Sequence, residues 1–316
     1  MHVLKPNPEA ARYAFKPAFI ERYSKITDFE VFKMYSLSFL RKSIRVNTIK
    51  TSIAEIKKRM ASIWQFEQIP WCNEGFWINH VEGRRDIGNT IEHVLGYIYV
   101  QEAASMIPPL VLDPQPDDRV LDIAAAPGSK TTQLAAMMHN KGILIANDVT
   151  GDRLASLGIN IMRTGAANIV VTQSQGERMR ELEFDKILVD APCSGTGTIR
   201  KSLSTLEMWN PDMVTRLAKT QQRILRNAFN MLAPRGTLVY STCSLEPEEN
   251  EGVVSEFLNT TPHAKLLPIE LDIIRSEPVK EWNEVVFHQD IKHCLRIWPQ
   301  DNDTEGFFVA KIEKQE

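Results

Sequence analysis

The stretch that decides the fold reads Val120-Leu121-Asp122-Ile123-Ala124-Ala125-Ala126-Pro127-Gly128-Ser129-Lys130-Thr131. Its apolar start predicts a buried strand, and the small residues with Pro127-Gly128 predict a tight turn that leads into a helix. Small side chains at such a turn let a cofactor approach the backbone. The spacing is not that of a phosphate-binding P-loop, because only one glycine of this stretch precedes Lys130.

Short apolar segments go on alternating with helical patterns from Pro116 onward. This alternation predicts an α/β fold with a doubly wound, mostly parallel sheet and helices on both of its faces. Strands are expected at residues 120–124, 143–147, 168–172, 186–190 and 237–241. Ligands of such sheets bind at the carboxyl ends of the strands.

The clearest helix of this region precedes the last expected strand. Asn210 can cap it, Pro211 suits its first position, and Gly236 lies just beyond its expected end. Apolar residues recur along one face, namely Val214, Leu217, Ile224, Leu225, Ala228 and Leu232. We expect this face to pack on the sheet.

The first hundred residues have a different pattern. Residues 18–41 and 51–64 mix apolar and charged residues at helical spacing, whereas residues 44–48 alternate like a short strand. The second helix should bury one face, made of Ile53, Ile56, Met60, Ile63 and Trp64. We therefore expect a small α+β unit over residues 1–110 and a larger α/β domain over residues 111–316.

The net charge of −3 conceals an uneven distribution. Residues 1–60 carry 13 Lys and Arg against 5 Asp and Glu, whereas the remainder carries 24 against 35. A basic segment on an acidic body predicts a local contact with a polyanion, although a solvated helical surface would carry the same charges. The candidate phosphate contacts are Arg41, Lys42, Arg45, Lys57, Lys58 and Arg59.

The bulk properties of the 316 residues are those of a soluble globular protein. No apolar stretch is long enough to span a bilayer, so we expect no contact with a membrane. The N-terminal Met1-His2-Val3-Leu4-Lys5-Pro6 lacks the apolar core of a signal peptide. These features favour a cytoplasmic location.

The four cysteines are Cys72, Cys193, Cys243 and Cys294. They lie far apart in the sequence and form none of the close pairs that are typical of zinc sites or small disulfide scaffolds. We expect reduced thiols and no metal. Each cysteine alone is most simply a small buried hydrophobe, so reactivity must be inferred from its neighbours.

Two of the expected strands are followed closely by a cysteine. The first segment reads Lys186-Ile187-Leu188-Val189-Asp190-Ala191-Pro192-Cys193-Ser194-Gly195-Thr196-Gly197, and the second reads Leu238-Val239-Tyr240-Ser241-Thr242-Cys243-Ser244. Because neighbouring strand ends face one crevice, the two thiols and a carboxylate can meet there.

One strand after the Pro127-Gly128 turn, Asp148 can accept hydrogen bonds from ribose hydroxyls. Alone, that turn and a helix cap at Asp148 would be ordinary structural features.

Together these motifs resemble the Sun-type (NOL/NOP/Sun) family of RNA cytosine-C5 methyltransferases, whose signatures are Asp-Ala-Pro-Cys and Thr-Cys-Ser. The similarity covers roughly residues 40–312. It includes, in order, Ile44-Arg45-Val46-Asn47-Thr48, Gln101-Glu102-Ala103-Ala104-Ser105-Met106, the Ala-Ala-Pro-Gly-Ser-Lys turn and Glu305-Gly306-Phe307-Phe308-Val309-Ala310-Lys311. The resemblance implies a Rossmann-like class I methyltransferase fold, S-adenosylmethionine as cofactor, and an N-terminal unit that binds RNA.

The resemblance also implies catalytic roles. It puts the covalent nucleophile on Cys243, the cysteine that assists product release on Cys193, and the catalytic acid on Asp190. The chemistry independently calls for a thiol, because C5 of cytosine is a poor nucleophile until a group adds to C6. Lys130 can help to hold Cys243 as a thiolate, unless it is a solvent-exposed helix residue.

The residues expected to bind S-adenosylmethionine follow the turn and the strand ends. They are Asp122, Ala124, Ala125, Ala126, Pro127, Gly128, Ser129, Lys130, Asp148, Arg153, Gln175 and Asp190. Two positions depart from the family pattern. Gln175 stands where the family usually has an acid that contacts the adenine amino group, although its carbonyl can accept the same bond. Gln300 stands where the family commonly has a histidine.

Several alternatives remain open from the sequence. The family modifies tRNA and ribosomal RNA, and a compact chain with no obvious additional RNA-binding domain after the catalytic region resembles its tRNA enzymes more. The resemblance therefore implies tRNA as the substrate, with ribosomal RNA as the alternative. An enzyme that methylates an adenine amino group would need no nucleophilic cysteine. A catalytically silent RNA-binding scaffold would keep the fold without needing Asp190, Cys193 and Cys243. We expect the chain to act as a monomer.

Overall fold

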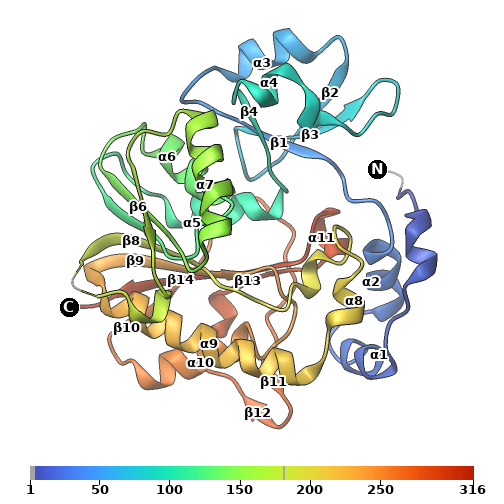
Figure 1. The fold of residues 1–316 in the computed structure, drawn as a ribbon. Helices are drawn as coiled ribbons and strands as arrows, with labels where there is room; N and C mark the ends of the chain where they lie inside the picture. The colour runs from blue at the N-terminus through green and yellow to red at the C-terminus, as the bar shows by residue number, and fades with distance from the viewer. Residues whose placement is uncertain (1–3, 181) are drawn as a thin grey trace.

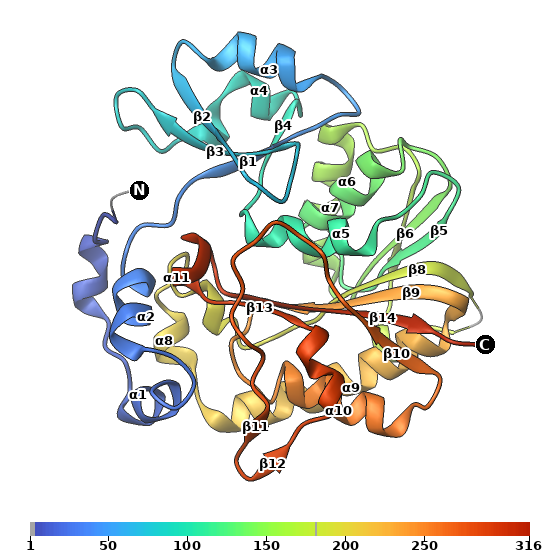
Figure 2. The same cartoon turned by 180° about the vertical axis from the view of Figure 1, so that it is seen from behind.

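The computed structural model describes residues 4–180 and 182–316. Met1, His2 and Val3, which belong to the segment examined for a signal peptide, lie outside the described residues. Figure 1 shows a small N-terminal unit above a larger α/β domain, and Figure 2 shows the same arrangement from behind. Within the described residues, no helix combines the length and apolar character needed to cross a bilayer.

The larger domain is built on one sheet of eight strands. All five strands expected from the sequence are present and parallel, in the spatial order β7-β6-β5-β8-β9. Their bounds are β5 (Arg119–Asp122), β6 (Ile143–Asp148), β7 (Ile169–Gln173), β8 (Phe184–Asp190) and β9 (Leu232–Thr242). Three strands complete the sheet beyond β9. β14 (Phe307–Lys314) pairs with β9 in antiparallel fashion, and β10 (Ala264–Leu267) and β13 (Leu295–Ile297) each pair with β14 in antiparallel fashion. The strand order reverses between β5 and β8, which creates a switch point where ligands bind.

Helices cover both faces of this sheet (Figures 1 and 2). One face carries α5 (Ile107–Leu112), α6 (Ser129–Met137) and α7 (Gly151–Thr164), and the other carries α9 (Pro211–Asn230) and α10 (Glu251–Thr260). Successive residues of β8 serve the two layers in turn: Ile187 and Val189 pack with α9 and α10, whereas Leu188 packs with α5 and α6. This is the doubly wound, mostly parallel α/β fold that the sequence predicts.

Helix α9 confirms the predicted start but ends earlier than expected. Asn210 accepts a hydrogen bond from the Met213 amide through its side-chain oxygen at 2.8 Å, and Pro211 is the first helical residue. Leu232 is wrongly placed in the helix by the sequence analysis, because it opens β9 instead. Gly236 lies inside β9, where a Cβ would approach the Ala233 carbonyl oxygen to 2.8 Å. Leu232 fits the helical spacing only by coincidence, because a strand that is buried on both faces is apolar at nearly every position.

The N-terminal unit is a four-stranded antiparallel sheet in the order β2-β3-β1-β4. Its elements are β1 (Ser43–Val46), α3 (Ile53–Met60), β2 (Trp64–Gln68), β3 (Gly75–His80), α4 (Ile91–Val94) and β4 (Ile98–Val100). The helix predicted at 51–64 therefore ends at Met60. Ile63 is 47% exposed and Trp64 begins β2, so neither belongs to the predicted helical face.

The first helices of the chain lie along the larger domain, beside α8 (Thr205–Met208) and α11 (Pro299–Asn302) (Figures 1 and 2). The helix expected at 18–41 is in fact two helices, α1 (Pro17–Tyr23) and α2 (Phe29–Ser36), and Asp28 caps the second one. Phe19 of α1 and Phe32 of α2 share one apolar cluster with Trp209. The basic segment 1–60 is thus divided, because α1 and α2 lie on the larger domain whereas β1 and α3 belong to the N-terminal unit. The predicted domain boundary at residue 110 stays a prediction.

The remaining elements are short. They are the 3-10 helices η1 (Pro8–Arg12), η2 (Ile87–Asn89), η3 (Ala104–Met106), η4 (Gly176–Arg178), η5 (Thr196–Thr198) and η6 (Gln289–His293), and the two-stranded ribbon of β11 (Glu281–Trp282) and β12 (Val285–Val286). Two of them matter for the site, because η4 follows β7 and η5 follows the turn after β8.

Arg45 ties the N-terminal unit to the larger domain. Its neighbours Ile44 and Val46 point into the core beneath α3, so Arg45 points to the opposite side of β1. There its Nε donates to Gln101 Oε1 at 2.8 Å and its Nη2 donates to Thr132 Oγ1 of α6 at 3.0 Å. Arg45 is only 2% exposed. This corrects the expectation that it contacts RNA phosphates, since its guanidinium is already used inside the protein.

We predict that Arg45→Ala lowers the free energy of unfolding by about 2–4 kcal/mol, because buried acceptors lose their donor. Urea unfolding followed by fluorescence measures this change. Lys58→Ala, which removes an exposed cation from α3, is the matched control and should leave the midpoint unchanged. Equal midpoints for Arg45→Ala and the parent would contradict the structural role.

Candidate active site

Two thiols meet at the carboxyl ends of β8 and β9. The strands pair in parallel register up to Asp190 and Ser241, so the loops that follow them leave the sheet at the same edge. Cys193 lies in the first loop and Cys243 in the second, and their sulfur atoms are 3.2 Å apart. Both cysteines are free and partly exposed. The prediction that these thiols lie together is confirmed.

A ladder of backbone hydrogen bonds holds the second loop. The Gly197 amide donates to the Cys243 carbonyl oxygen at 2.9 Å, and the Gly306 amide donates to the Gly197 carbonyl oxygen at 2.9 Å. A Cβ at Gly197 would collide with both the Gly306 and the Cys243 carbonyl oxygens, so only glycine permits this approach. The Glu305-Gly306-Phe307 segment therefore supports the backbone of Cys243 through Gly197.

Asp190 and Lys130 form an ion pair beside the thiols. Lys130 Nζ lies 2.6 Å from Asp190 Oδ2, and Ser241 donates its hydroxyl to Asp190 Oδ1 at 2.8 Å. Burial alone would lower the pKa of Lys130, but the attraction of Asp190 and, more weakly, of Cys243 outweighs burial and raises it. With a side chain only 11% exposed, Lys130 is a buried cation facing the site and not a solvated helix residue.

The two thiols are held in different environments. The hydrogen bond to Cys243, burial, and the negative charges of Cys243, Glu249 and Asp190 raise the pKa of Cys193 well above its ordinary value. The raised pKa makes the thiolate form of Cys193 a strong base, and the positive charge of Lys130 lies near Cys243. Cys72 and Cys294 are buried elsewhere, and burial raises the pKa of both. They are structural thiols.

A cavity of about 280 Å³ opens next to the thiols. Its walls are mostly small or apolar residues, and its polar lining groups lie at or just after the ends of β6, β7, β8 and β9, except for Arg153, which comes from α7. The lining residues are Ile123, Ala124, Ala126, Asp148, Val149, Arg153, Ser174, Gly176, Asp190, Ala191, Pro192, Cys193, Ile224 and Cys243. Several residues expected to bind the cofactor therefore share one cavity with both cysteines.

Asp148 closes the end of β6 against the Ala-Ala-Pro-Gly turn. Its Oδ2 accepts a hydrogen bond from the Ala126 amide at 3.1 Å, and its Oδ1 accepts one from the Val149 amide at 2.8 Å. Arg153 lies 3.4 Å from Oδ1 and donates to the Ala126 carbonyl oxygen at 2.7 Å. Asp148 thus fixes the turn, and its Oδ2, which accepts a single hydrogen bond, keeps a lone pair for a ligand in the cavity.

Other residues expected around the cofactor lie behind or beside the cavity wall. Ala125, Pro127, Gly128 and Ser129 continue the turn into α6 without lining the cavity. Asp122 is buried beneath the turn, where Thr131 donates to it at 2.7 Å and burial raises its pKa to about 7. Gln175 is exposed between the lining residues Ser174 and Gly176. Gln300 does not line the cavity, and its Nε2 donates a hydrogen bond to Thr27 Oγ1 at 2.9 Å.

The basic residues predicted from the first 60 positions are scattered. Lys57, Lys58 and Arg59 are exposed on α3, on the side of the N-terminal sheet that faces away from the larger domain (Figures 1 and 2). Arg41 stacks on Trp77, with 4.1 Å between its guanidinium carbon and the ring centre, and pairs with Glu67. The structure does not bring these residues to the site.

Lys42 belongs to a cationic cluster that the sequence analysis missed. Burial and, more weakly, the charges of Arg85 and Lys201 lower the pKa of Lys42. Arg200, the residue before Lys201, donates to the Phe39 carbonyl oxygen at 2.9 Å, so the segments that carry the three cations meet. Arg85 is held by a 2.8 Å hydrogen bond to the Leu40 carbonyl oxygen. Lys201 is exposed and follows the loop that carries Cys193. Only folding unites these three residues, and their spacing in the sequence carries no signal of it.

No metal centre is evident in residues 4–180 and 182–316, because no group of three or more His, Cys, Asp or Glu side chains is placed to hold an ion.

Comparisons with known proteins agree with this geometry. A family model described as 16S rRNA methyltransferase RsmB/F matches residues 109–313, and one described as the N-terminal domain of 16S rRNA methyltransferase RsmF matches residues 15–103. The tRNA (cytosine(49)-C(5))-methyltransferase of Pyrococcus abyssi is 45% identical over 93% of this chain and 95% of its own length. The ribosomal RNA small subunit methyltransferase F of Shewanella sp. (strain ANA-3) is 44% identical over 87% of this chain, which spans only 56% of that relative.

Solved structures show the same similarity over nearly the whole chain. A methyltransferase homolog protein from Pyrococcus horikoshii has a TM-score of 0.85 and 37% identity, with 97% of both chains covered. NSun6 from Pyrococcus horikoshii with SFG has a TM-score of 0.83 and covers 96% of this chain and 99% of its own, but at 24% identity it supports the fold alone. With its family model, its relatives and its motifs in agreement, the chain belongs to the RsmB/F, or Sun-type, family of RNA methyltransferases.

Proposed function

We propose that this enzyme transfers a methyl group from S-adenosylmethionine to C5 of a cytosine in RNA, through a covalent bond between Cys243 and C6 of the base. The observation that carries the proposal is the pair of sulfur atoms 3.2 Å apart beside the Asp190–Lys130 ion pair. Methylation of an adenine amino group would give these thiols no task. A silent scaffold would not need a buried cation held against them.

The cavity suits S-adenosylmethionine. Ala124 and Ala126 leave room for the cofactor against the backbone, and Asp148 offers acceptors for ribose hydroxyls. Gln175 would approach the adenine from the rim that Ser174 and Gly176 form. When bound, S-adenosylmethionine supplies an electrophilic methyl group.

The protein's own residues activate the cytosine. The Cys243 thiolate forms a bond to C6, and the electrons of the C5–C6 double bond shift toward C5 and N3. Asp190 would donate a hydrogen bond or a proton to N3 once it carries a proton, and Lys130, which is paired with it, can supply that proton. After methylation, Cys193 in its thiolate form takes the proton from C5, the double bond re-forms, and Cys243 leaves as a thiolate. The base must be unpaired or flipped out for this attack.

We propose tRNA as the substrate, because the Pyrococcus abyssi relative named for tRNA matches nearly from end to end. Ribosomal RNA is the second candidate, because the N-terminal family model and the Shewanella relative are named for ribosomal RNA. That the enzyme works as a metal-free monomer in the cytoplasm is part of the same proposal.

For the RNA path we propose two cationic areas. The first is the cluster of Lys42, Arg85 and Lys201, which joins the N-terminal unit to the loop after Cys193. The second is the α3 surface of Lys57, Lys58 and Arg59. Cations at such positions neutralise phosphates without reading the sequence, and they orient the RNA on a body that is otherwise acidic.

The first prediction tests the nucleophile. Cys243→Ala should bind S-adenosylmethionine as the parent does but show no turnover on RNA, because nothing then adds to C6. Calorimetry measures cofactor binding, and incorporation of labelled methyl groups measures turnover. Bisulfite sequencing of the modified RNA would locate the methylcytosine. Substantial methylation by Cys243→Ala would overturn the proposal.

A second prediction concerns the cofactor. Asp148→Ala should weaken S-adenosylmethionine binding at least about tenfold, since the ribose hydroxyls lose a charged acceptor. Asp148→Asn keeps one oxygen that can accept a hydrogen bond from the turn. Its Kd for S-adenosylmethionine should therefore lie between those of Asp148→Ala and the parent. Asp152→Ala, an exposed acid on α7, is the control in calorimetry. An unchanged Kd for Asp148→Ala would mean that the cofactor does not bind beside Asp148.

A third prediction distinguishes the two cationic areas. Each lost phosphate contact should lower the slope of log K against log salt by about one unit. We expect the double variant Arg85→Gln with Lys201→Gln to bind RNA more weakly and with a flatter slope, while cofactor binding stays unchanged. Lys57→Gln with Lys58→Gln is the matched comparison. If only the α3 variant changes the slope, the cluster beside the site is not an RNA contact.

A further inference from the structure

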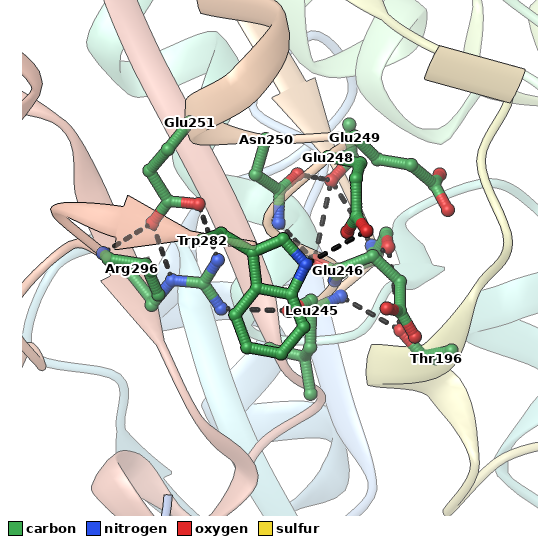
Figure 3. Close-up of polar contacts among 12 residues, drawn as sticks. Thr196, Leu245, Glu246, Glu248, Glu249, Asn250, Glu251, Trp282 and Arg296 are labelled. Carbon is green, nitrogen blue, oxygen red and sulfur yellow. Dashed lines mark hydrogen bonds and ion pairs between the residues drawn. The ribbon is translucent and has the colours of Figure 1, made fainter. Parts of the chain in front are cut away.

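Four glutamates follow Cys243 within eight residues, and the chain turns so that they point in different directions (Figure 3). Three of them meet cations: Glu246 and Glu248 pair with Arg22, and Glu251 pairs with Arg296 at 2.6 Å. Glu249 differs, because no ion pair of Glu249 is found among the described residues. In Figure 3 its side chain extends away from the Glu251–Arg296 pair.

Glu249 instead binds the loop that carries Cys193. Its Oε2 accepts a hydrogen bond from the Ser194 amide at 2.9 Å. Gln221 of α9 donates through Nε2 to the same Oε2 at 2.9 Å and to the Pro192 carbonyl oxygen at 2.9 Å. The residues immediately before and after Cys193 are therefore held by one clamp, made of Glu249 and Gln221.

This arrangement is costly for the fold. Glu249 is fully buried, and its Oε1 has no hydrogen-bond partner within the part of the chain that the structure describes. Burial and, more weakly, the charge of Glu246 raise its pKa, whereas the hydrogen bonds from Ser194 and Gln221 lower it. The net result is a pKa of about 7. A buried acid without a cation rarely improves stability, so its position favours a role in the site.

The two thiols are held by different contacts. The backbone of Cys243 is fixed by the bond from Gly197 and by the pairing of β9 with β14, and neither involves Glu249. The Cys193 loop retains a 3.0 Å contact between Ser194 Oγ and Ser244 Oγ when the clamp is lost. Loss of the clamp should therefore displace Cys193 by a small amount, while Cys243 stays in place and the protein folds.

We propose that Glu249 and Gln221 are positioning residues that hold Cys193 at C5 of the methylated cytosine, so that the enzyme can release its product. The inference rests on the proposed role of Cys193. In that step the C5–H bond breaks, its proton goes to the thiolate of Cys193, its electron pair re-forms the C5–C6 double bond, and the C6–S bond breaks so that Cys243 leaves as a thiolate. The clamp matters for this step and not for the earlier addition of Cys243.

The experiment incubates the full-length enzyme with S-adenosylmethionine and tRNA transcript, and measures two quantities: steady-state methylation and the protein–RNA complex that survives denaturation. Cys193→Ala is the reference for a trapped complex. Glu249→Ala and Gln221→Ala should both accumulate this complex, with steady-state turnover lowered roughly 10- to 100-fold. Glu249→Gln keeps an oxygen for Ser194 and should restore much of the release.

Glu246→Gln is the matched control, because it changes another buried acid of the same segment that contacts Arg22, Tyr23 and Trp209 instead of the Cys193 loop. It should trap no complex, even if stability falls. If Glu249→Ala does not fold, Gln221→Ala alone decides the question.

Two failures are distinguishable. If Cys193→Ala traps the complex but folded Glu249→Ala and Gln221→Ala do not, the clamp is only structural and the proposed function stands. If Cys193→Ala itself traps no complex, the role of Cys193 in the proposed function is wrong, and the positioning role falls with it.

Discussion

The chemistry of the molecule depends on the parallel pairing of β8 with β9. Residues fifty positions apart in the sequence, Cys193 and Cys243, become neighbours because the two strands run in register up to the edge where their loops begin. The same edge receives Lys130 from the start of α6, which brings a cation to Asp190. A shift of register by one residue would turn every side chain of β9 to the opposite face and separate the thiols.

Buried polar groups support this edge from several directions. Glu249 and Gln221 hold the loop of Cys193, the Gly197–Gly306 ladder holds the loop of Cys243, and Asp148 holds the turn beside the cavity. Arg45 and Gln101 connect the same α6 helix to the N-terminal unit. Such groups add little net stability compared with well-packed apolar residues, although truncating one leaves its buried partners unsatisfied. Each one fixes an orientation, which a catalytic site requires.

The sequence predicts the central sheet well, because alternating strands and helices with motifs at the strand ends leave few arrangements open. Asp190, Cys193 and Cys243 could be found because they end neighbouring strands. Helix ends were predicted less well. Leu232 fits both a helix face and a buried strand, and Trp64 opens a hairpin only because it pairs with His80 across the sheet. Spacing alone cannot distinguish these cases.

The electrostatic predictions depended most on the fold. A count of charges treats Arg45 and Lys58 alike, yet folding buries the first and exposes the second. Lys42, Arg85 and Lys201 come from three distant segments, so no local pattern indicates that they meet. The same is true of Gln221 and Glu249, whose identities are ordinary and whose shared contact with the Cys193 loop is visible only in three dimensions.

The central claim is that catalysis passes through a bond between Cys243 and the target base. The most direct test uses tRNA transcript in which 5-fluorocytidine replaces cytidine, because the fluorine at C5 blocks the final loss of a proton. After incubation with S-adenosylmethionine and nuclease digestion, peptide mass spectrometry locates the modified residue. A nucleotide adduct on the peptide at Cys243 is the result that we predict. An adduct on Cys193 with none on Cys243, or no adduct from enzyme that methylates ordinary RNA, would contradict the account.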